Sequence, residues 1–275
     1  MFHSPTLYPL YFPFMSRSPV ILFLLLFCAS AGSFAQQRAV DRTWLFGIGA
    51  SALYDSYLSP LDYHGPSASI AMTNERRARW GKGRVSSFAR WNVQASMGEN
   101  PSKNAEFYDG NVDISLGWHY NWHFPRHWTL KAGALAEFSL GGTYSSRGGN
   151  NPAQGRAAFD IAASVMADYH FRLRSHPCSL RLQADAPVAG MMFSPQYGQS
   201  YYEIFSLRHY DRNVRPTYPG NVPSLHFSAL LTFPLRKARI VAGYQADVRQ
   251  SHVNHLRRHA WSNAFVVGFR RHLLF

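Results

Sequence analysis

Apolar and polar residues alternate with a period of two through most of this chain, as they do in a β-strand whose two faces meet different surroundings. The stretch 110–122 is the clearest case. One of its faces carries Val112, Ile114, Leu116, Trp118, Tyr120 and Trp122, and the other carries Asn111, Asp113, Ser115, Gly117, His119 and Asn121. The stretch 157–172 repeats the pattern. Long apolar faces that end in aromatic residues are typical of strands that cross a bilayer.

Strand length separates two folds that share this alternation. A soluble sandwich or barrel would turn its apolar face inward, and its strands usually run about 5 to 6 residues. A tilted transmembrane strand needs roughly 9 to 11 residues or more. Most of the alternating segments reach or exceed that length, and they predict strands at 43–54, 67–77, 84–97, 108–123, 128–143, 156–172, 179–186, 223–233, 239–248 and 261–275.

The connections between these segments alternate in length. Short ones lie at 78–83, 124–127, 173–178 and 234–238, and long ones lie at 55–66, 98–107, 144–155, 187–222 and 249–260. Outer-membrane barrels have short periplasmic turns, longer external loops and periplasmic termini. The pattern therefore predicts an all-β fold: a transmembrane antiparallel up-and-down β-barrel of 10 to 12 strands in the outer membrane, with periplasmic termini.

The long segment 187–222 leaves the strand number open. It is long for a structureless loop, and 200–207 could form a strand, in which case an added hairpin would give twelve strands. Alternatively, 187–222 lies outside the barrel or enters the lumen as a constriction or plug. Ten and twelve strands are equally compatible with the sequence.

The N-terminus has the pattern of a cleaved secretory signal. An apolar run at 20–27 follows Arg17 and precedes the small-residue stretch 29–35, and it is too short to span a bilayer. We therefore expect a signal peptide at 1–35, a short periplasmic segment at 36–42 and the barrel at 43–275, with Met1 or Met15 as the start. Cys28 leaves with the signal, so the mature chain keeps only Cys178 and forms no internal disulfide.

The net charge of +13 stays with the mature part, because residues 1–35 carry only Arg17 as a charged side chain. An exported protein does not normally meet nucleic acid, so we expect no nucleic-acid partner. Basic residues at membrane interfaces suit anionic lipid and lipopolysaccharide phosphates. The final strand, with Phe265, Val267, Phe269, Leu273 and Phe275 on one face, is expected to be read by the outer-membrane barrel insertion machinery.

Charged residues at predicted lumen positions bear on whether the bore of the barrel is open or filled by side chains. The carboxylates Asp113, Glu137, Asp160, Asp168 and Asp185 share the predicted lumen face with Lys131, Arg90, Arg172, Arg181 and Arg239. Inward side chains can largely fill a barrel of this size. A salt-bridged plug is therefore favoured over a pore, in which the same charges would set ion selectivity.

Two further sets of residues are candidates for chemistry. His226 and Ser228 share one face at i and i+2, where His226 could activate Ser228 as in a lipid hydrolase, but that face points to the lumen. The segment around Tyr197, Gln199, Tyr201, Tyr202 and Glu203 has the aromatic and amide composition of a glycan-binding or peptide-binding surface, or of a gate. The favoured alternative is that its aromatic residues pack the long segment onto the barrel mouth.

His252, His255 and His259 have a spacing that could hold a metal, yet Arg257 and Arg258 would oppose a bound cation. We expect no metal and no cofactor.

Three loop sequences resemble one known family. GGNNPAQ at 148–154, MFSPQYGQSYYEIF at 192–205 and QSHVN at 250–254 are similar to the signatures of an uncharacterised outer-membrane family catalogued as a domain of unknown function and widespread in Bacteroidetes. The resemblance spans about 44–275, and the 192–205 stretch is its specific part. It implies the same fold and location, with no known activity.

The sequence thus predicts an outer-membrane β-barrel of unknown specific activity, more consistent with a non-enzyme. A small gated pore or a ligand-binding barrel is the first hypothesis, with a small molecule or glycan as the possible ligand. The alternatives are a lipid hydrolase using His226 and Ser228 and a plugged barrel with a structural or surface-interaction role.

Overall fold

The computed structural model describes residues 39–147, 149, 151–235 and 238–274. The predicted signal peptide, residues 36–38 and the end of the last strand at Phe275 lie outside these residues. The elements are β1 (Ala39–Asp55), β2 (Ser59–Arg77), β3 (Val85–Glu99), β4 (Glu106–Phe124), β5 (Trp128–Ser145), β6 (Ala153–Leu173), β7 (His176–Phe193), α2 (Tyr201–Phe205), β8 (Val214–Thr217), β9 (Leu225–Leu235), β10 (Ala238–Val253) and β11 (Leu256–Leu274).

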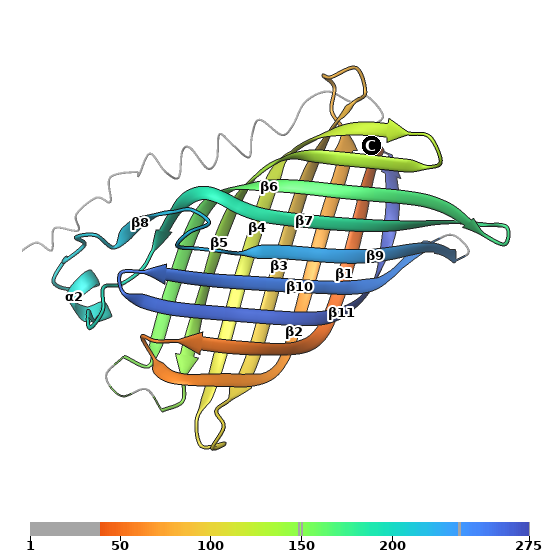
Figure 1. Cartoon of the computed structure of the whole chain (residues 1–275). Helices are drawn as coiled ribbons and strands as arrows, with labels where there is room; N and C mark the ends of the chain where they lie inside the picture. The colour runs from red at the N-terminus through yellow and green to blue at the C-terminus, as the bar shows by residue number, and fades with distance from the viewer. Residues whose placement is uncertain (1–38, 148, 150, 236–237, 275) are drawn as a thin grey trace, which may run out of the picture. The chain divides into compact units, whose positions relative to one another are not determined.

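Ten of the described strands form a closed antiparallel barrel, and β8 is an additional short strand on β7 (Figure 1). Each long strand pairs with its neighbour in sequence, except that β7 pairs with β9. The ring closes where β1 pairs with β11, from Ala39 opposite Leu274 to Asp55 opposite Arg258. The strand number is therefore ten, and the expected segment 223–233 is confirmed as β9.

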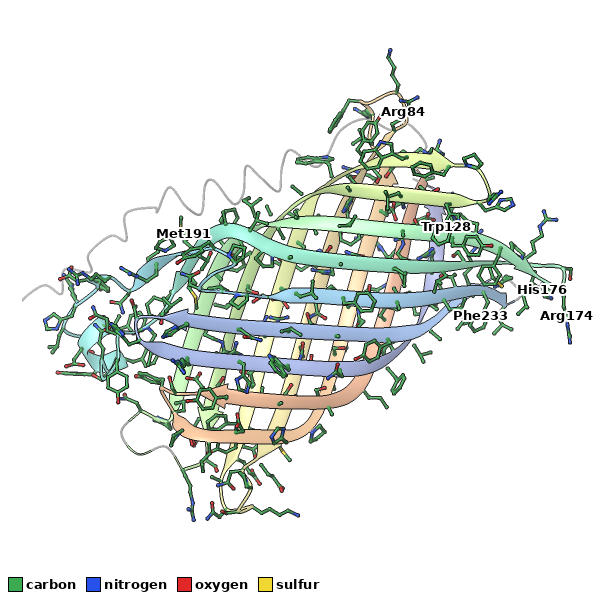
Figure 2. The ribbon with its side chains drawn as sticks, in the orientation of Figure 1. Arg84, Trp128, Arg174, His176, Met191 and Phe233 are labelled. Atoms are coloured by element: carbon green, nitrogen blue, oxygen red, sulfur yellow. The ribbon has the colours of Figure 1, made fainter. Side chains whose placement is uncertain are left out.

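The apolar face of the barrel points outward. Ile48 on β1 and Phe265 on β11 are 74% and 75% exposed, while inward neighbours such as Ser51 and Ser262 are buried. Trp128 and Phe233 lie on the outer surface towards one end, and Met191 lies on it towards the other (Figure 2). A soluble protein does not cover itself with apolar side chains, so this surface excludes the soluble alternative and defines a transmembrane barrel.

Inside the barrel, small apolar clusters fill the spaces between polar residues. One contains Leu45, Ala71, Leu230, Val241 and Val266, and another contains Phe88, Leu135, Ala162 and Met166. None of the described helices is long and apolar enough to cross a membrane.

Residues 201–205 form a short helix, so the strand that the sequence left possible at 200–207 does not form. Ser200 caps α2: its hydroxyl accepts from the backbone N–H of Glu203, and the carboxylate of Glu203 accepts from the backbone N–H of Ser200. This reciprocal capping box satisfies two backbone donors at the helix start, and it outweighs the aromatic and β-branched composition that favoured a strand.

Most of the connections expected to be long are shorter, because the strands continue past the apolar belt. The expected loop 249–260 is an example: β10 runs to Val253 and β11 begins at Leu256, joined by a tight turn in which Asn254 and His255 have positive φ angles of 52° and 63°. Backbone hydrogen bonding between paired strands does not depend on contact with lipid, so polar residues there extend the ladders.

We call the end of the barrel that carries this turn the mouth, and residues 194–224 the capping segment. In Figure 1, α2 and β8 of the capping segment lie at the same end of the barrel as the β10–β11 turn. The termini of the described barrel, Ala39 and Leu274, lie at the opposite end, which we call the turn end.

Candidate functional site

Charged side chains from facing strands pair inside the barrel, beginning near the turn end. Arg181 on β7 contacts Glu75 on β2 at 2.8 Å and Asp168 on β6 at 2.6 Å. Lys131 on β5 pairs with the same two carboxylates, with 2.7 Å between its Nζ and Asp168. Two cations and two carboxylates thus form one cluster across the lumen.

A second cluster lies around Arg90 on β3, which is buried. Its guanidinium donates to Asp185 on β7 at 2.5 Å and to Glu137 on β5 at 3.0 Å. Asp185 also accepts from Ser164 at 2.5 Å, and Ser164 contacts the ring of His119 at 2.8 Å. These hydrogen bonds compensate the cost of burying the charges.

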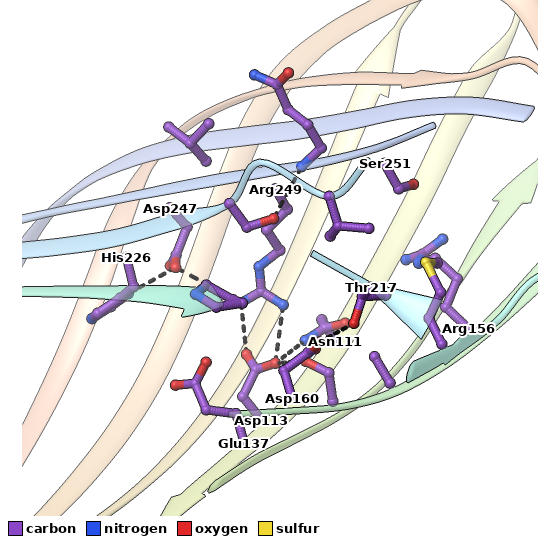
Figure 3. Close-up of a pocket in the computed structure, with 18 of the residues that line it drawn as sticks. Asn111, Asp113, Glu137, Arg156, Asp160, Thr217, His226, Asp247, Arg249 and Ser251 are labelled. Atoms are coloured by element: carbon purple, nitrogen blue, oxygen red, sulfur yellow. Dashed lines mark hydrogen bonds and ion pairs between the residues drawn. The ribbon is translucent and has the colours of Figure 1, made fainter. Parts of the chain in front are cut away.

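A third cluster lies nearer the mouth (Figure 3). Arg249 on β10 donates two parallel hydrogen bonds to the carboxylate of Asp113 on β4, at 3.0 and 2.6 Å. Its neighbour Asp247 accepts from Nδ1 of His226 on β9 at 2.7 Å. Above them, Asp109 pairs with Arg156 at 2.6 Å and with Arg258 at 3.2 Å.

The strand positions of these pairs show that they cross the lumen. In a ring of ten strands, β2 and β7 are diametrically opposite, and so are β4 and β10. The pairs Glu75–Arg181 and Asp113–Arg249 therefore span the full bore, and Arg90–Asp185 spans nearly as much. Ion pairs of the described residues thus lie in the lumen at three levels.

The capping segment is fixed to the mouth by hydrogen bonds. The hydroxyl of Thr217 donates to the lumen residue Asp160 at 2.6 Å, and the hydroxyl of Tyr57 in the β1–β2 turn donates to the carbonyl of Gln199 at 2.9 Å. The side chain of Asn254 donates to the carbonyls of Ser194 and Arg212, both at 3.0 Å. The segment therefore lies across the mouth as a structured cap.

A cavity of about 140 Å³ lies beside the third cluster and extends from residues of the second cluster, such as Glu137, to Thr217 of the cap. Its polar wall includes Asp113, His226, Asp247 and Arg249, and its less polar wall includes Pro187, Met192, Val222 and Leu225. It holds roughly ten water-sized groups, since one water needs about 10–15 Å³. The cavity is thus large enough for a small polar ligand or for one end of a larger molecule.

The predicted binding residues of the capping segment fall into two groups. Gln199, Tyr201 and Glu203 hold the cap together: Tyr201 bonds to the backbone of Gly155, and Gln199 donates to the carbonyl of His209 at 2.9 Å. Tyr197 and Tyr202 are exposed, at 73% and 66%. These exposed rings are the members of the set that are available to a ligand outside the barrel.

Ionisation of two groups in this region is shifted by their surroundings. Burial raises the pKa of Tyr57 to about 12, so its hydroxyl remains a hydrogen-bond donor to Gln199 at any physiological pH. Hydrogen bonds from the backbone and side chain of Ser200 hold the pKa of Glu203 below its ordinary value. The carboxylate of Glu203 in the capping box therefore stays ionised near neutral pH.

His226 and Ser228 both point to the lumen, and a carboxylate does lie beside His226. Asp247 occupies the position opposite His226 in the β9–β10 ladder. Ser228 is 2% exposed, and no hydrogen bond joins it to His226 in the described structure. The pair with Asp247 could be found from sequence only by fixing the register between β9 and β10.

Several partners in the lumen were missed by sequence reasoning. Glu75, Asp109, Asp247, Arg156 and Arg249 alternate inward like the predicted lumen charges, and that periodicity was the available signal. Conversely, the predicted lumen residues Arg172 and Arg239 are exposed and form no ion pair with described residues. Both lie near the turn end of the barrel.

The candidate metal residues do not gather at one point. His259 stacks on Tyr54 and contacts Asp62 at 3.2 Å, whereas His252 and His255 lie at the β10–β11 turn. Within the described ranges, no group of three or more potential ligands could hold a metal ion.

The fold and the lumen define the class: a ten-stranded transmembrane β-barrel with an ion-paired interior and a capped mouth. The chain belongs to the family described as "Protein of unknown function (DUF3316)", whose model matches residues 19–275. The expected membership of a family of unknown function is thus confirmed, while its occurrence in Bacteroidetes stays a prediction. No curated protein was found to match the chain.

Solved structures similar to the chain are outer-membrane barrels. The transport unit of the autotransporter AIDA-I from Escherichia coli is 8% identical, with a TM-score of 0.40, over 90% of this chain and 97% of that one. The outer membrane protease OmpT from Escherichia coli is 9% identical, with a TM-score of 0.44, over 88% and 99%. The translocator domain of the autotransporter NalP from Neisseria meningitidis is 12% identical, with a TM-score of 0.38, over 93% and 96%.

Proposed function

We propose that this protein is a closed ligand-binding barrel of the outer membrane, which takes part of a small ligand into the cavity beneath the capping segment. The observation that carries this proposal is the lining of the cavity: ion-paired residues that span the bore form one part of it, and Thr217 of the hydrogen-bonded cap forms another. A side-chain plug supports binding at the mouth rather than passage through the barrel.

We further propose that the turn end faces the periplasm and the mouth faces the outside. The outward apolar surface supports a place in the outer membrane, because only a closed barrel or a helix satisfies its backbone groups in lipid. The longest connection, 194–224, lies at the mouth, and the longest loops of such barrels are external.

Conductance measurements in planar bilayers test the closed lumen. We expect no discrete conductance from the purified protein, and none after deletion of residues 196–215, because the ion pairs below the cap remain. Conductance of the intact protein would overturn the proposal. Conductance that appears only after the deletion would support the gated pore instead.

Thiol labelling tests the cavity. In a Cys178→Ser background, Ser251→Cys on the cavity wall should react with a small water-soluble thiosulfonate reagent and much more slowly with a polyethylene-glycol maleimide. Ser164→Cys, which replaces a residue of the second cluster that is 2% exposed, is the matched control and should react with neither. Equal labelling of the two positions would mean that the lumen is open to water.

A further inference from the structure

The wall of the barrel has a gap in its backbone pairing on the mouth side of β9. The last pair between β7 and β9 joins Asp185 to His226, and pairing on this edge of β7 resumes only at Gly190, with Thr217 of β8. No described residue forms a ladder pair with residues 186–189 on that edge. On the other side of the gap, the irregular stretch 218–224 lies between the end of β8 and the start of β9.

Two prolines explain why this gap does not close. If the β7–β9 register continued, residues 186–188 would face residues 223–225, which include Pro223 opposite Val188. Pro187 and Pro223 have no backbone N–H and cannot donate to a ladder. In addition, β7 has a bulge at Val188, which is skipped between Pro187 and Ala189 in the pairing with β6.

The gap lies within the apolar belt of the barrel. Residues on the mouth side of it still face outward, since Phe159 on β6 and Met191 on β7 are 46% and 52% exposed. Unpaired backbone in contact with hydrocarbon is costly unless a cavity or a polar group covers it. Here the unpaired backbone borders the cavity, because Pro187 on one edge of the gap and Ser224 on the other both line it.

The cavity therefore joins the lipid face to the charged lumen. It is lined by Leu225 and Val248, which form an outward-facing cross-strand pair, and also by the inward residues Asp113 and Arg249. Its volume of about 140 Å³ is too small for a whole lipid, but it suits a head group of about ten heavy atoms. Such a ligand could leave its hydrocarbon chains in the bilayer.

The charges in the cavity indicate which head group fits. Four arginines line it with four aspartates and one glutamate, so the lining is nearly balanced in charge. No described residue bonds to Nε of Arg156 or Arg249, to Oε2 of Glu137, or to Oδ2 of Asp160, and all four side chains line the cavity. Donors for a phosphate and acceptors for an ammonium group are thus present together.

We propose that this opening, formed by residues 186–189 and 222–225, admits the head group of a zwitterionic phospholipid sideways from the membrane. The phosphate faces Arg156 and Arg249, and an ammonium group that can donate hydrogen bonds faces Glu137 and Asp160. Phosphatidylethanolamine has this chemistry, whereas phosphatidylcholine has no ammonium donor and phosphatidylglycerol has no cation. This inference rests on the proposed function and identifies its ligand.

Native mass spectrometry of the detergent-purified protein, incubated with an equimolar mixture of the three phospholipids, tests this inference. We expect one tightly retained phosphatidylethanolamine. Ser224→Trp fills the opening and should abolish its retention, while Ala95→Trp adds the same indole to the outward face of the closed β2–β3–β4 wall and should not. Retention in proportion to the mixture, or unchanged retention in Ser224→Trp, would overturn the proposal.

A second variant tests the proposal independently, in case Ser224→Trp does not fold. Asp160→Asn keeps an oxygen that can accept from Thr217 but removes the charge that faces the ammonium. It should lower the preference for phosphatidylethanolamine over phosphatidylcholine roughly tenfold, as expected for a lost charge-assisted hydrogen bond. An unchanged preference would contradict the assigned orientation.

These outcomes are separate from those of the proposed function. If no lipid is retained but Ser251→Cys still reacts selectively with the small reagent, the ligand cavity stands and the lipid proposal fails. If Ser164→Cys reacts with the small reagent as fast as Ser251→Cys does, the closed barrel itself is wrong.

Discussion

The guanidinium of Arg249 and the carboxylate of Asp113 meet across the full width of the lumen, through two parallel hydrogen bonds of 3.0 and 2.6 Å. They come from β10 and β4, which are diametrically opposite in the ring of ten strands. A bidentate pair of this kind holds both charged groups in one geometry. It therefore acts as a brace between the two sides of the barrel.

Removal of one partner of this pair should destabilise the barrel strongly. Arg249→Leu leaves the carboxylate of Asp113 buried without its cation, which costs about 3–5 kcal/mol. The double variant Arg249→Leu with Asp113→Leu removes both charges and should recover most of that loss. Urea-dependent unfolding, followed by the gel shift between folded and unfolded barrels, measures the effect. A single variant as stable as the wild type would contradict the brace.

Asn254 should control the rigidity of the cap. It has a positive φ of 52°, and its side chain donates to carbonyls of the capping segment. Asn254→Gly keeps the backbone conformation but loses the hydrogen bonds, and Asn254→Ala loses both. We therefore expect trypsin to cleave at the exposed Arg208 and Arg212 faster in Asn254→Gly, and faster still in Asn254→Ala. Equal rates in all three proteins would show that the cap is held by other contacts.

The capping box should determine the stability of α2. Ser200→Ala removes the hydroxyl that accepts from Glu203, and loss of such a cap costs about 1 kcal/mol. Hydrogen exchange of the α2 amides should then accelerate about fivefold. Ser206→Ala is the matched control, because Ser206 contributes its backbone N–H to the helix end. The interpretation fails if the control accelerates exchange as much as Ser200→Ala does.

The same box predicts a pH dependence. The pKa of Glu203 is lowered in the folded protein, so its stabilising effect is complete above the ordinary glutamate pKa of about 4.3. It is lost as the pH falls through the lower, folded value. Exchange in α2, corrected for its intrinsic rate, should therefore be constant from neutrality to about pH 5 and rise in stronger acid. A rise between pH 7 and 5 would contradict this assignment.

Closure between β1 and β11 should be sensitive to a single methyl group. A Cβ at Gly268 would lie 1.7 Å from the carbonyl oxygen of Trp44, whereas a Cβ at Gly110 would have no atom within 4 Å. Gly268→Ala must push the two strands apart and should cost about 1–3 kcal/mol. Gly110→Ala should be nearly neutral. The folded fraction after refolding into detergent, read from heat-modifiable migration, compares them, and equal fractions would refute the close approach.

Lipid hydrolysis by His226 and Ser228 is not expected. Ser228 is almost fully buried and does not line the cavity, although His226 and Asp247 do. Fatty-acid release from phospholipid vesicles should therefore stay at background for the wild type, His226→Ala and Ser228→Ala alike. Release by the wild type that both substitutions abolish would establish the hydrolase alternative.

The sequence by itself determined the strands and their faces. In β4, apolar and polar residues alternate up to Trp122. This alternation depends only on the two-residue period of an extended chain and on the difference in polarity between the lipid and the lumen. The same reasoning predicted ten segments that the structure confirms. It also predicted inward charges such as Asp113 and Arg181, because periodicity assigns each residue to a face.

The tertiary structure decided which of those charges meet, and where the wall opens. Arg249 and Asp113 are 136 residues apart in the chain, and their contact depends on the closure and curvature of the whole ring. The helix at 201–205 depends on the reciprocal hydrogen bonds between Ser200 and Glu203. The composition of this segment favours a strand and does not predict these bonds. The gap in the wall beside Pro187 lies where the register of β7 and β9 brings Pro187 and Pro223, which are far apart in the sequence, to its two edges. Local periodicity carries no information about such distant partners.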